Sequence, residues 1–310
     1  MMEICVFALG GNALLRMGER PTFAQQAKNA RKSAMELCKF ISKNRNVGVL
    51  ITHGNGPQVG EELLRDEYSR NIIPEMPLYA LGGSTQANIG MMLEIALIEG
   101  LSKAGVRREV VTILTHTCVK EDEALLKPTK PVGPFYTARE LREELKTERF
   151  DYVKEKGHYR RVVPSPTPVA VIEADAIRKA IVGGAIVIAC GGGGIPVIKS
   201  GKTYRWVNAV IDKDRTTQVI ANALSAKQLF ILTDTDYVYS DYPKNKKPIV
   251  KIMARNLKKM VGSFENGTMG PKIEASIKFI EQGGKEAHIG ELFKLSEMLK
   301  RRSGTRIMAN

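Results

Sequence analysis

The segment Ile51–Gly60, ITHGNGPQVG, is the most informative part of the sequence because it joins a strand pattern directly to a helix pattern. An apolar run, Val47–Thr52, leads into its three glycines and its proline. Glycine permits positive φ and close backbone approach, and the N–H groups at a helix start attract anions. The segment therefore predicts a turn at the end of a strand that handles a phosphate or another anion.

Two further apolar runs end in glycine. Ile4–Leu9 is followed by Gly10 and Gly11, and Ala185–Cys190 is followed by Gly191–Gly194. In an open α/β sheet, ligands bind outside the carboxyl ends of the strands. Three such strand ends predict one shared anion site, with three unrelated tight turns as the alternative.

The composition is that of an ordinary globular chain. The 310 residues are 43% hydrophobic and 26% charged, which suits one large α/β domain or two lobes. The first apolar run is only about six residues long, so we expect a strand there and neither a signal peptide nor a membrane span. The four cysteines show no CxxC spacing, which indicates reduced thiols in a cytoplasmic protein.

The chain is basic, with 47 Lys and Arg against 33 Asp and Glu and a formal net charge of +14. The basic residues are dispersed and are not interleaved with the aromatic residues that stacking on bases requires. We therefore expect no nucleic-acid partner and no membrane partner. A positive field would still help to gather anionic substrates.

Strand and helix patterns alternate along the chain, which predicts a three-layer α/β fold built on a doubly wound, mainly parallel sheet. The alternation stops over about 118–168, where Pro, Lys, Glu and aromatic residues accumulate around one charged helix near Ala138–Glu148. We interpret this segment as a lid inserted into an N-terminal acceptor lobe, 1–180, which is followed by a C-terminal nucleotide-binding lobe, 181–310. Other expected features are a helix cap at Thr22, a helix over about 85–104, a strand over 110–115, a hairpin turn at Ser200 and Gly201, and a helix from about Arg215.

Three lysines stand in unusual local sequences. Lys130 lies in PTKPVGPFY, where three prolines stiffen the backbone, and Lys272 lies in GTMGPK at an expected helix start. Lys213 lies in VIDKD between Asp212 and Asp214, just past an apolar run that reads as a strand. Phosphoryl transfer requires cations around the moving group and little covalent chemistry from the protein. Three fixed lysines near glycine turns match that requirement.

Each of these residues also has an ordinary structural interpretation. A lysine is most often a solvated surface charge, Lys127 is an alternative to Lys130, and Asp212 is equally well explained as a helix cap. No Walker motif and no HRD or DFG triplet occurs. Among the four histidines, His53 alone adjoins a glycine turn, and we expect a structural role for it.

Taken together, the motifs resemble those of carbamate kinases, which belong to the amino acid kinases, and they occur in the family order over nearly the whole chain. PTKPVGPFY in particular separates carbamate kinases from other amino acid kinases. The resembling stretches are ALGGNAL at Ala8–Leu14, ITHGNGPQVG at Ile51–Gly60, PTKPVGPFY at Pro128–Tyr136, RRVVPSP at Arg160–Pro166, GGGGIPV at Gly191–Val197, AVIDKD at Ala209–Asp214, GTMGPK at Gly267–Lys272 and GTRI at Gly304–Ile307.

The resemblance implies an amino acid kinase fold with a protruding lid, a homodimer, and the reaction ATP plus carbamate to ADP plus carbamoyl phosphate. Mg²⁺ is implied as the cofactor, bridging the nucleotide phosphates, with no metal site made by the protein alone. On the acceptor side, the residues implied are Gly10, Gly11 and Asn12 at the transferring phosphoryl group and Gly54, Asn55 and Gly56 around carbamate.

The same resemblance assigns the charged residues. Lys130 would descend from the lid onto the transferring group, and Lys213 and Lys272 would neutralise the nucleotide phosphates. Asp212 and Asp214 would orient these lysines. Gly11 and Asn12 complete the implied catalytic set. The remaining nucleotide contacts implied are Gly10, Thr233, Asp234, Tyr239, Met269 and Gly270.

Some positions depart from the family pattern, and they bear on acceptor specificity. The departures are Thr85, Ala87 and Met91 in TQANIGM, His158 before RRVVPSP, Arg215 after VIDKD, and Tyr237 in LTDTDYVY. Two alternatives therefore stay open. One is a kinase of the same fold for another carboxylate or phosphate acceptor, and the other is a nucleotide-binding homologue without catalysis.

Overall fold

A central sheet of eight strands runs through the protein. The computed structural model describes residues 2–16, 18–124, 128–144, 151–155, 157–240, 246–264 and 269–309. All neighbouring strands of this sheet are parallel except the pair β16 and β17. The strand order is β15 (Lys251–Met253), β17 (Thr305–Met308), β16 (Glu286–Glu291), β12 (Gln228–Thr233), β1 (Ile4–Leu9), β2 (Gly48–His53), β9 (Ile186–Ile188) and β3 (Val110–Thr112).

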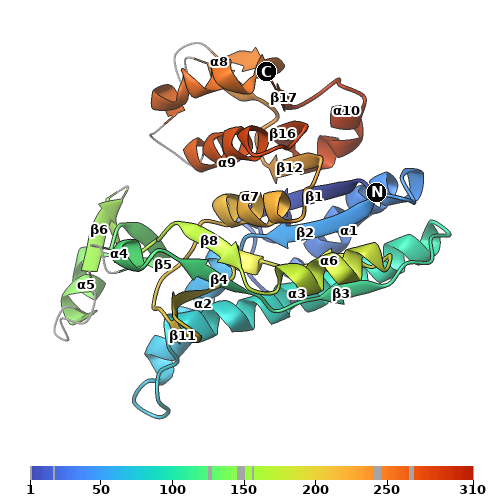
Figure 1. Ribbon diagram of the computed structural model, residues 1–310. Helices are drawn as coiled ribbons and strands as arrows, with labels where there is room; N and C mark the ends of the chain where they lie inside the picture. The colour runs from blue at the N-terminus through green and yellow to red at the C-terminus, as the bar shows by residue number, and fades with distance from the viewer. Residues whose placement is uncertain are drawn as a thin grey trace.

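Helices cover both faces of this sheet (Figure 1). Strands β1 and β2 are buried at every residue, as expected where helices pack on both sides. One face carries α1 (Phe23–Lys43), α3 (Leu78–Lys103) and α10 (Leu295–Leu299). The other face carries α6 (Ala174–Val182), α7 (Lys213–Ala223), α8 (Ala254–Lys258) and α9 (Gly270–Glu281). The predicted three-layer, mainly parallel α/β fold is confirmed.

Smaller sheets flank the central one. One of them has four strands, in the order β11 (Thr203–Trp206), β10 (Ile195–Ser200), β4 (His116–Val119) and β8 (Pro168–Val171). Strands β10 and β11 form the expected hairpin, with Ser200 opposite Thr203, so that its turn residues are Gly201 and Lys202. A separate pair is formed by β13 (Val238–Ser240) and β14 (Lys247–Ile249).

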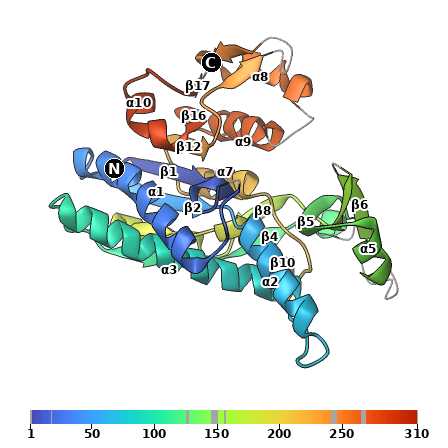
Figure 2. The ribbon, with the colours of Figure 1, turned by 180° about the vertical axis from the view of Figure 1, so that it is seen from behind.

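The lid protrudes from one end of the molecule, beyond the central sheet (Figures 1 and 2). It contains the sheet β5 (Lys130–Tyr136), β7 (His158–Val163) and β6 (Asp151–Glu155), with α5 (Ala138–Glu144) beside it and α4 (Glu121–Ala124) before it. The sequence showed only the helix, whose expected residues 145–148 lie outside the described part. Strands were missed here because most described lid positions are exposed or only partly buried and carry little hydrophobic alternation.

The lid meets the body through two glycines. A Cβ at Gly60, on α2 (Gly56–Ser69), would lie 3.1 Å from the Gly133 Cα of β5. Gly133 itself has a φ of +75°, which disfavours other residues. This close contact places the lid strand that begins at Lys130 directly over the segment ITHGNGPQVG.

Two expected boundaries were wrong. Helix α3 begins at Leu78 instead of about Thr85, because Gly82 and Gly83 lie within the helix, and Gly83 leaves room for the Ile195 side chain. Strand β3 ends at Thr112, after which the chain crosses to the second sheet. The central sheet includes strands from both 1–180 and 181–310, and the division into two lobes stays a prediction. Within the described ranges, no helix is long and apolar enough to cross a membrane.

Candidate active site

The first two glycine turns lie side by side, as predicted. Strands β1 and β2 are neighbours, and the Gly54 N–H donates to the Leu9 carbonyl at 2.9 Å. A Cβ at Gly54 would lie 3.3 Å from the Gly11 nitrogen and 3.4 Å from Lys213 Cδ. The two turns are therefore in contact with each other and with the stem of the Lys213 side chain, at the carboxyl edge of the sheet.

A helix follows each of these two turns. Gly10 precedes the 3₁₀ helix η1 (Gly11–Ala13), and Asn55 is the N-cap of α2. The backbone of Asn12 lies within η1, whereas its side chain is outside what the structure describes. The helix starts supply backbone N–H groups where the sequence predicted an anion site.

The third glycine cluster, in η3 (Gly191–Gly193), accommodates neighbouring side chains. A Cβ at Gly191 would lie 2.4 Å from the His53 ring, and one at Gly192 would lie 2.2 Å from the Asn55 amide nitrogen. Burial lowers the pKa of His53 to about 4, so its ring is neutral at physiological pH. The geometry agrees with the structural role expected for this histidine and gives η3 a packing function.

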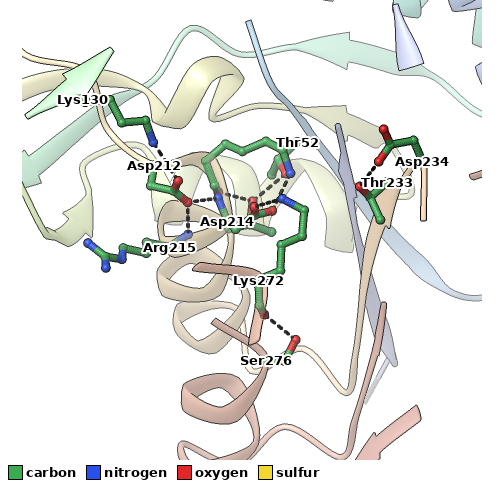
Figure 3. Close-up of polar contacts among 11 residues, drawn as sticks. Thr52, Lys130, Asp212, Asp214, Arg215, Thr233, Asp234, Lys272 and Ser276 are labelled. Carbon is green, nitrogen blue, oxygen red and sulfur yellow. Dashed lines mark hydrogen bonds and ion pairs between the residues drawn. The ribbon is translucent and has the colours of Figure 1, made fainter. Parts of the chain in front are cut away.

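Two lysines form ion pairs with one carboxylate at the start of α7. Lys213 Nζ contacts Asp214 Oδ1 at 2.5 Å, and Lys272 Nζ contacts Asp214 Oδ2 at 3.0 Å. Figure 3 shows Lys272 reaching Asp214 from α9. The three side chains are almost fully buried, and burial lowers the pKa of Lys213 while Asp214 opposes that effect. This group carries a positive charge in excess of its carboxylate, next to the glycine turns.

Asp212 joins the lid to the same helix. Its Oδ1 accepts hydrogen bonds from the backbone N–H groups of Asp214 and Arg215, at 2.9 and 3.3 Å, so it is the N-cap of α7. Its Oδ2 accepts from Lys130 Nζ at 2.9 Å (Figure 3). Burial would raise the pKa of Asp212, but the charge and hydrogen bond of Lys130 lower it to about 2. The cap and the lysine partner, which the sequence offered as alternatives, are both present.

The expectation that Lys213 follows a strand was wrong. The residues between β11 and α7 form no regular strand, and Lys213 is the first residue of its helix. The apolar residues there are buried for another reason. Ala209 and Ile211 pack in a small cluster with Val119, Ile198 and Val207 beneath the second sheet.

A cavity of about 580 Å³ opens beside the lysine pair. Five predicted nucleotide residues line it, namely Gly10, Lys213, Thr233, Asp234 and Lys272, together with the predicted acceptor residue Gly11. Its other lining residues are Ala13, Arg16, Leu232, Glu291, Leu292 and Phe293. Sequence reasoning missed Arg16, whose guanidinium lies 4.7 Å from the centre of the Phe293 ring. The one feature of the sequence that pointed to Arg16 was its position shortly after the first glycine turn.

Other predicted site residues lie apart from this cavity. Tyr239 is on β13 and donates to Asp236 Oδ1 at 2.7 Å, while Met269 and Gly270 begin α9. These three do not line the cavity, and their nucleotide contacts stay predictions. Gly56 lines a second cavity of about 420 Å³ between α2 and the lid. Lys127 lies outside the described residues.

Most of the family departures lie on surfaces. Ala87 and Met91 are on the exposed face of α3, and His158 is exposed on the lid. Tyr237 donates its hydroxyl to the Arg302 carbonyl at 3.2 Å. The Arg215 guanidinium contacts Glu274 Oε2 of α9 at 3.0 Å. Thr85 differs from these because it is buried and bonded to Asn55.

The fold, the glycine turns and the lysine cluster define a phosphotransferase of the amino acid kinase class, and the sequence comparison agrees. Residues 3–291 match the amino acid kinase family, and the chain belongs to that family. Its full-length relatives place it with the carbamate kinases, as the motif resemblance predicted. The prediction that the chain is a kinase is thereby confirmed.

Individual relatives match along their whole length. The chain is 41% identical to a carbamate kinase of Pyrococcus horikoshii over 314 residues, covering 99% of each chain. It is 42% identical to a carbamate kinase of Pyrococcus furiosus over 311 residues, covering 98% of each. Among solved structures, carbamate kinase from Giardia lamblia bound to AMP-PNP superposes with a TM-score of 0.91 at 33% identity, covering 100% of this chain and 99% of that one.

Proposed function

We propose that this kinase transfers a phosphoryl group reversibly between ATP and carbamate, giving ADP and carbamoyl phosphate. The observation that carries the proposal is the meeting of Lys130, Lys213 and Lys272 around the first turn of α7, beside the cavity that Gly10 and Gly11 of the first glycine turn line. Carbamate kinases of the same length and a neighbour with bound AMP-PNP support it.

The geometry suits stabilisation of charge by fixed cations. Lys213 and Lys272 line the cavity and neutralise the nucleotide phosphates, while Lys130 reaches the transferring group from the lid. Carbamate attacks the γ-phosphorus in line through an oxygen that is already anionic, so no general base is needed. The neutral ring of the nearby His53 is consistent with such a mechanism.

The charged residues of the site are compatible with a magnesium ion that arrives bound to the nucleotide. Both oxygens of Asp214 contact lysines, and Asp212 is occupied by Lys130 and by its helix cap. Within the described ranges, no three His, Cys, Asp or Glu side chains are grouped as metal ligands. A Mg²⁺ ion would therefore be held chiefly by the nucleotide itself, and when bound it would supply charge neutralisation to the phosphates beside Lys213 and Lys272.

An acceptor screen tests the proposal. ATP consumption is measured with carbamate, formed from ammonium and bicarbonate, and then with acetate, aspartate, glutamate and nucleoside monophosphates at equal concentrations. We expect turnover with carbamate to exceed the others by about 100-fold or more, since a site that hydrogen-bonds an N–H group of its substrate rejects analogues that lack it. A higher rate with another acceptor would support a different kinase. Tight ADP binding without turnover would support a non-catalytic homologue.

We also propose that the chain forms a homodimer through α3. The buried face of this helix is largely apolar, and Met91, Ile95 and Ile98 remain 44–49% exposed on the face turned away from the sheet. A helix of that kind is normally covered on both faces. Sedimentation velocity should show a dimer for the wild type and a monomer for Ile95→Glu. Ile72→Glu, at an exposed position beyond α2, serves as the control, and a monomeric wild type would refute the proposal.

The remaining partner and location predictions keep their sequence basis. The four cysteines are free, and burial raises the pKa of Cys5 and Cys190 to about 12, so these two thiols are unreactive. We continue to expect a cytoplasmic protein that binds neither nucleic acid nor membrane.

A further inference from the structure

Asn55 occupies the N-cap of α2 but does not cap that helix. Asparagine is among the most favoured N-cap residues because its side-chain oxygen accepts an N–H group of the first turn. Here the side chain makes no such bond. Its amide nitrogen instead donates to Thr85 Oγ1, on α3, at 2.8 Å. The amide is therefore held by another helix, away from its usual role.

The hydrogen bonds of Thr85 determine the orientation of the Asn55 side-chain amide. The Thr85 hydroxyl donates its only proton to the Gly82 carbonyl at 2.7 Å. It can then only accept from Asn55, so the amide nitrogen faces Thr85 and the oxygen Oδ1 faces away from it. Thr85 is 1% exposed, which keeps water from competing for this bond.

The packing around Asn55 holds the amide in this orientation. A Cβ at Gly192 would lie 2.2 to 2.4 Å from the three terminal atoms of the Asn55 amide, so the amide lies directly against the glycine backbone. Within the described part of the chain, Oδ1 accepts no hydrogen bond and one proton of Nδ2 has no acceptor. The carbonyl oxygen and one N–H proton of the Asn55 amide thus have no partner among the described residues, and Asn55 directly follows Gly54, which contacts Gly11 and Lys213.

From this arrangement we infer that the Asn55 amide recognises the amino group of the acceptor and that Thr85 is its positioning residue. The inference rests on the proposed function. Carbamate carries an N–H₂ donor next to its carboxylate, acetate carries a methyl group there, and bicarbonate carries a hydroxyl. An oxygen whose direction is fixed by Thr85 accepts from the amino group and is left unpaired by a methyl group, which penalises acetate.

The test compares two phosphoryl donors that differ at that group. ATP formation from ADP is measured with carbamoyl phosphate and with acetyl phosphate, and the ratio of their kcat/KM values is the readout. Thr85→Val removes the hydroxyl with little change of shape, Thr85→Ser retains it, and Ser84→Ala is the matched control on the neighbouring exposed position of α3. Asn55→Ala and the double variant Asn55→Ala with Thr85→Val complete a cycle that tests whether Thr85 acts through Asn55.

We expect Thr85→Val to lower the ratio about tenfold or more, chiefly through kcat/KM for carbamoyl phosphate, with the KM for ADP unchanged. Thr85→Ser and Ser84→Ala should keep the wild-type ratio, and Thr85→Val should add nothing to Asn55→Ala. An unchanged ratio in both Thr85→Val and Asn55→Ala would overturn the inference while leaving the kinase assignment intact. No ATP from carbamoyl phosphate in the wild type would overturn the proposed function and this inference with it. If Thr85→Val fails to bind ADP, the ratio in Asn55→Ala decides.

Discussion

Lys130 Nζ lies 2.9 Å from Asp212 Oδ2, so an ion pair joins the lid of this kinase to the N-cap of α7. The Lys130 side chain is 39% exposed and that of Asp212 is 14% exposed, which places the pair at the border between the buried lysine cluster and solvent. In the proposed reaction, the Lys130 ammonium group exchanges this carboxylate for the transferring phosphoryl group. The ion pair also connects the lid to α7.

Replacing Lys130 should affect turnover more than nucleotide binding. Lys130→Ala is expected to lower kcat by about 100-fold, because a fixed cation aimed at developing charge is lost, while the Kd for ADP changes less than about threefold. Steady-state kinetics and calorimetry measure the two effects. Lys120→Ala, which removes a similarly exposed lysine paired with Glu123, is the control. An unchanged kcat would remove Lys130 from the mechanism.

The two roles of Asp212 can be separated by substitution. Asparagine caps a helix about as well as aspartate but cannot pair with Lys130, whereas alanine does neither. Asp212→Ala should therefore be about 1 kcal/mol less stable than Asp212→Asn, although both lose turnover to a similar extent. Urea unfolding and ATP formation provide the comparison. Equal stability of the two variants would show that the capping bonds contribute nothing.

Lys272 and Lys213 are expected to act on the nucleotide. Lys272→Ala should raise the Kd for ADP about tenfold, since it removes a charged hydrogen-bond donor from the cavity wall. Lys213→Ala should weaken binding at least as much, because its side chain also contacts the Gly54 turn. Calorimetric titration with ADP measures both, with the exposed Lys179→Ala on α6 as the control. Wild-type affinity in either variant would contradict its assignment.

Stability should fall in mild acid because two histidines are buried in neutral form. Burial lowers the pKa of His53 and of His288 to about 4, below the 6.5 of an exposed histidine. The unfolded state therefore takes up more protons between these values, so stability is full above pH 6.5 and is lost as the pH falls towards 4. We expect each histidine to cost about 1 to 2 kcal/mol between pH 7 and pH 5.

The variant His288→Phe tests the origin of this loss. His288 stacks on Phe230 with ring centres 4.6 Å apart, so phenylalanine retains the packing and cannot take up a proton. Urea unfolding of the variant should change less between pH 7 and pH 5 than that of the wild type. The exposed His158→Gln is the control and should follow the wild type. A variant with the full wild-type pH dependence would contradict the explanation.

Structural features that are encoded by a few neighbouring residues could be predicted from the sequence. Apolar runs that end at Gly10 and Gly54 predicted parallel strands, which the structure pairs as β1 and β2, and the local setting of Lys130, Lys213 and Lys272 singled out three side chains that the structure brings to the start of α7. These features were readable because a strand end, a proline-stiffened segment and a helix start are all encoded within a few residues.

What was missed depends on contacts between distant segments. The bond from Asn55 to Thr85 joins residues 30 apart, and the stacking of Arg16 on Phe293 joins the two ends of the chain. The glycines of η3 were predicted as part of an anion site, but Gly191 and Gly192 leave room for His53 and Asn55, and a Cβ clash cannot be seen from sequence. The expected start of helix α3 was too late because Gly82 and Gly83 lie inside the helix, and the packing of Gly83 against Ile195 involves a residue more than 100 positions away.

The most direct test of the central claim is phosphorus NMR of a mixture of ADP, carbamoyl phosphate and Mg²⁺ with the wild-type protein and, in parallel, with Lys130→Ala. We expect each carbamoyl phosphate consumed above the spontaneous rate to yield one ATP, because the mixed anhydride has the higher transfer potential, and we expect this conversion to collapse in the variant. ADP that is bound by the wild-type protein, with carbamoyl phosphate decaying only at its spontaneous rate, would contradict the proposed function.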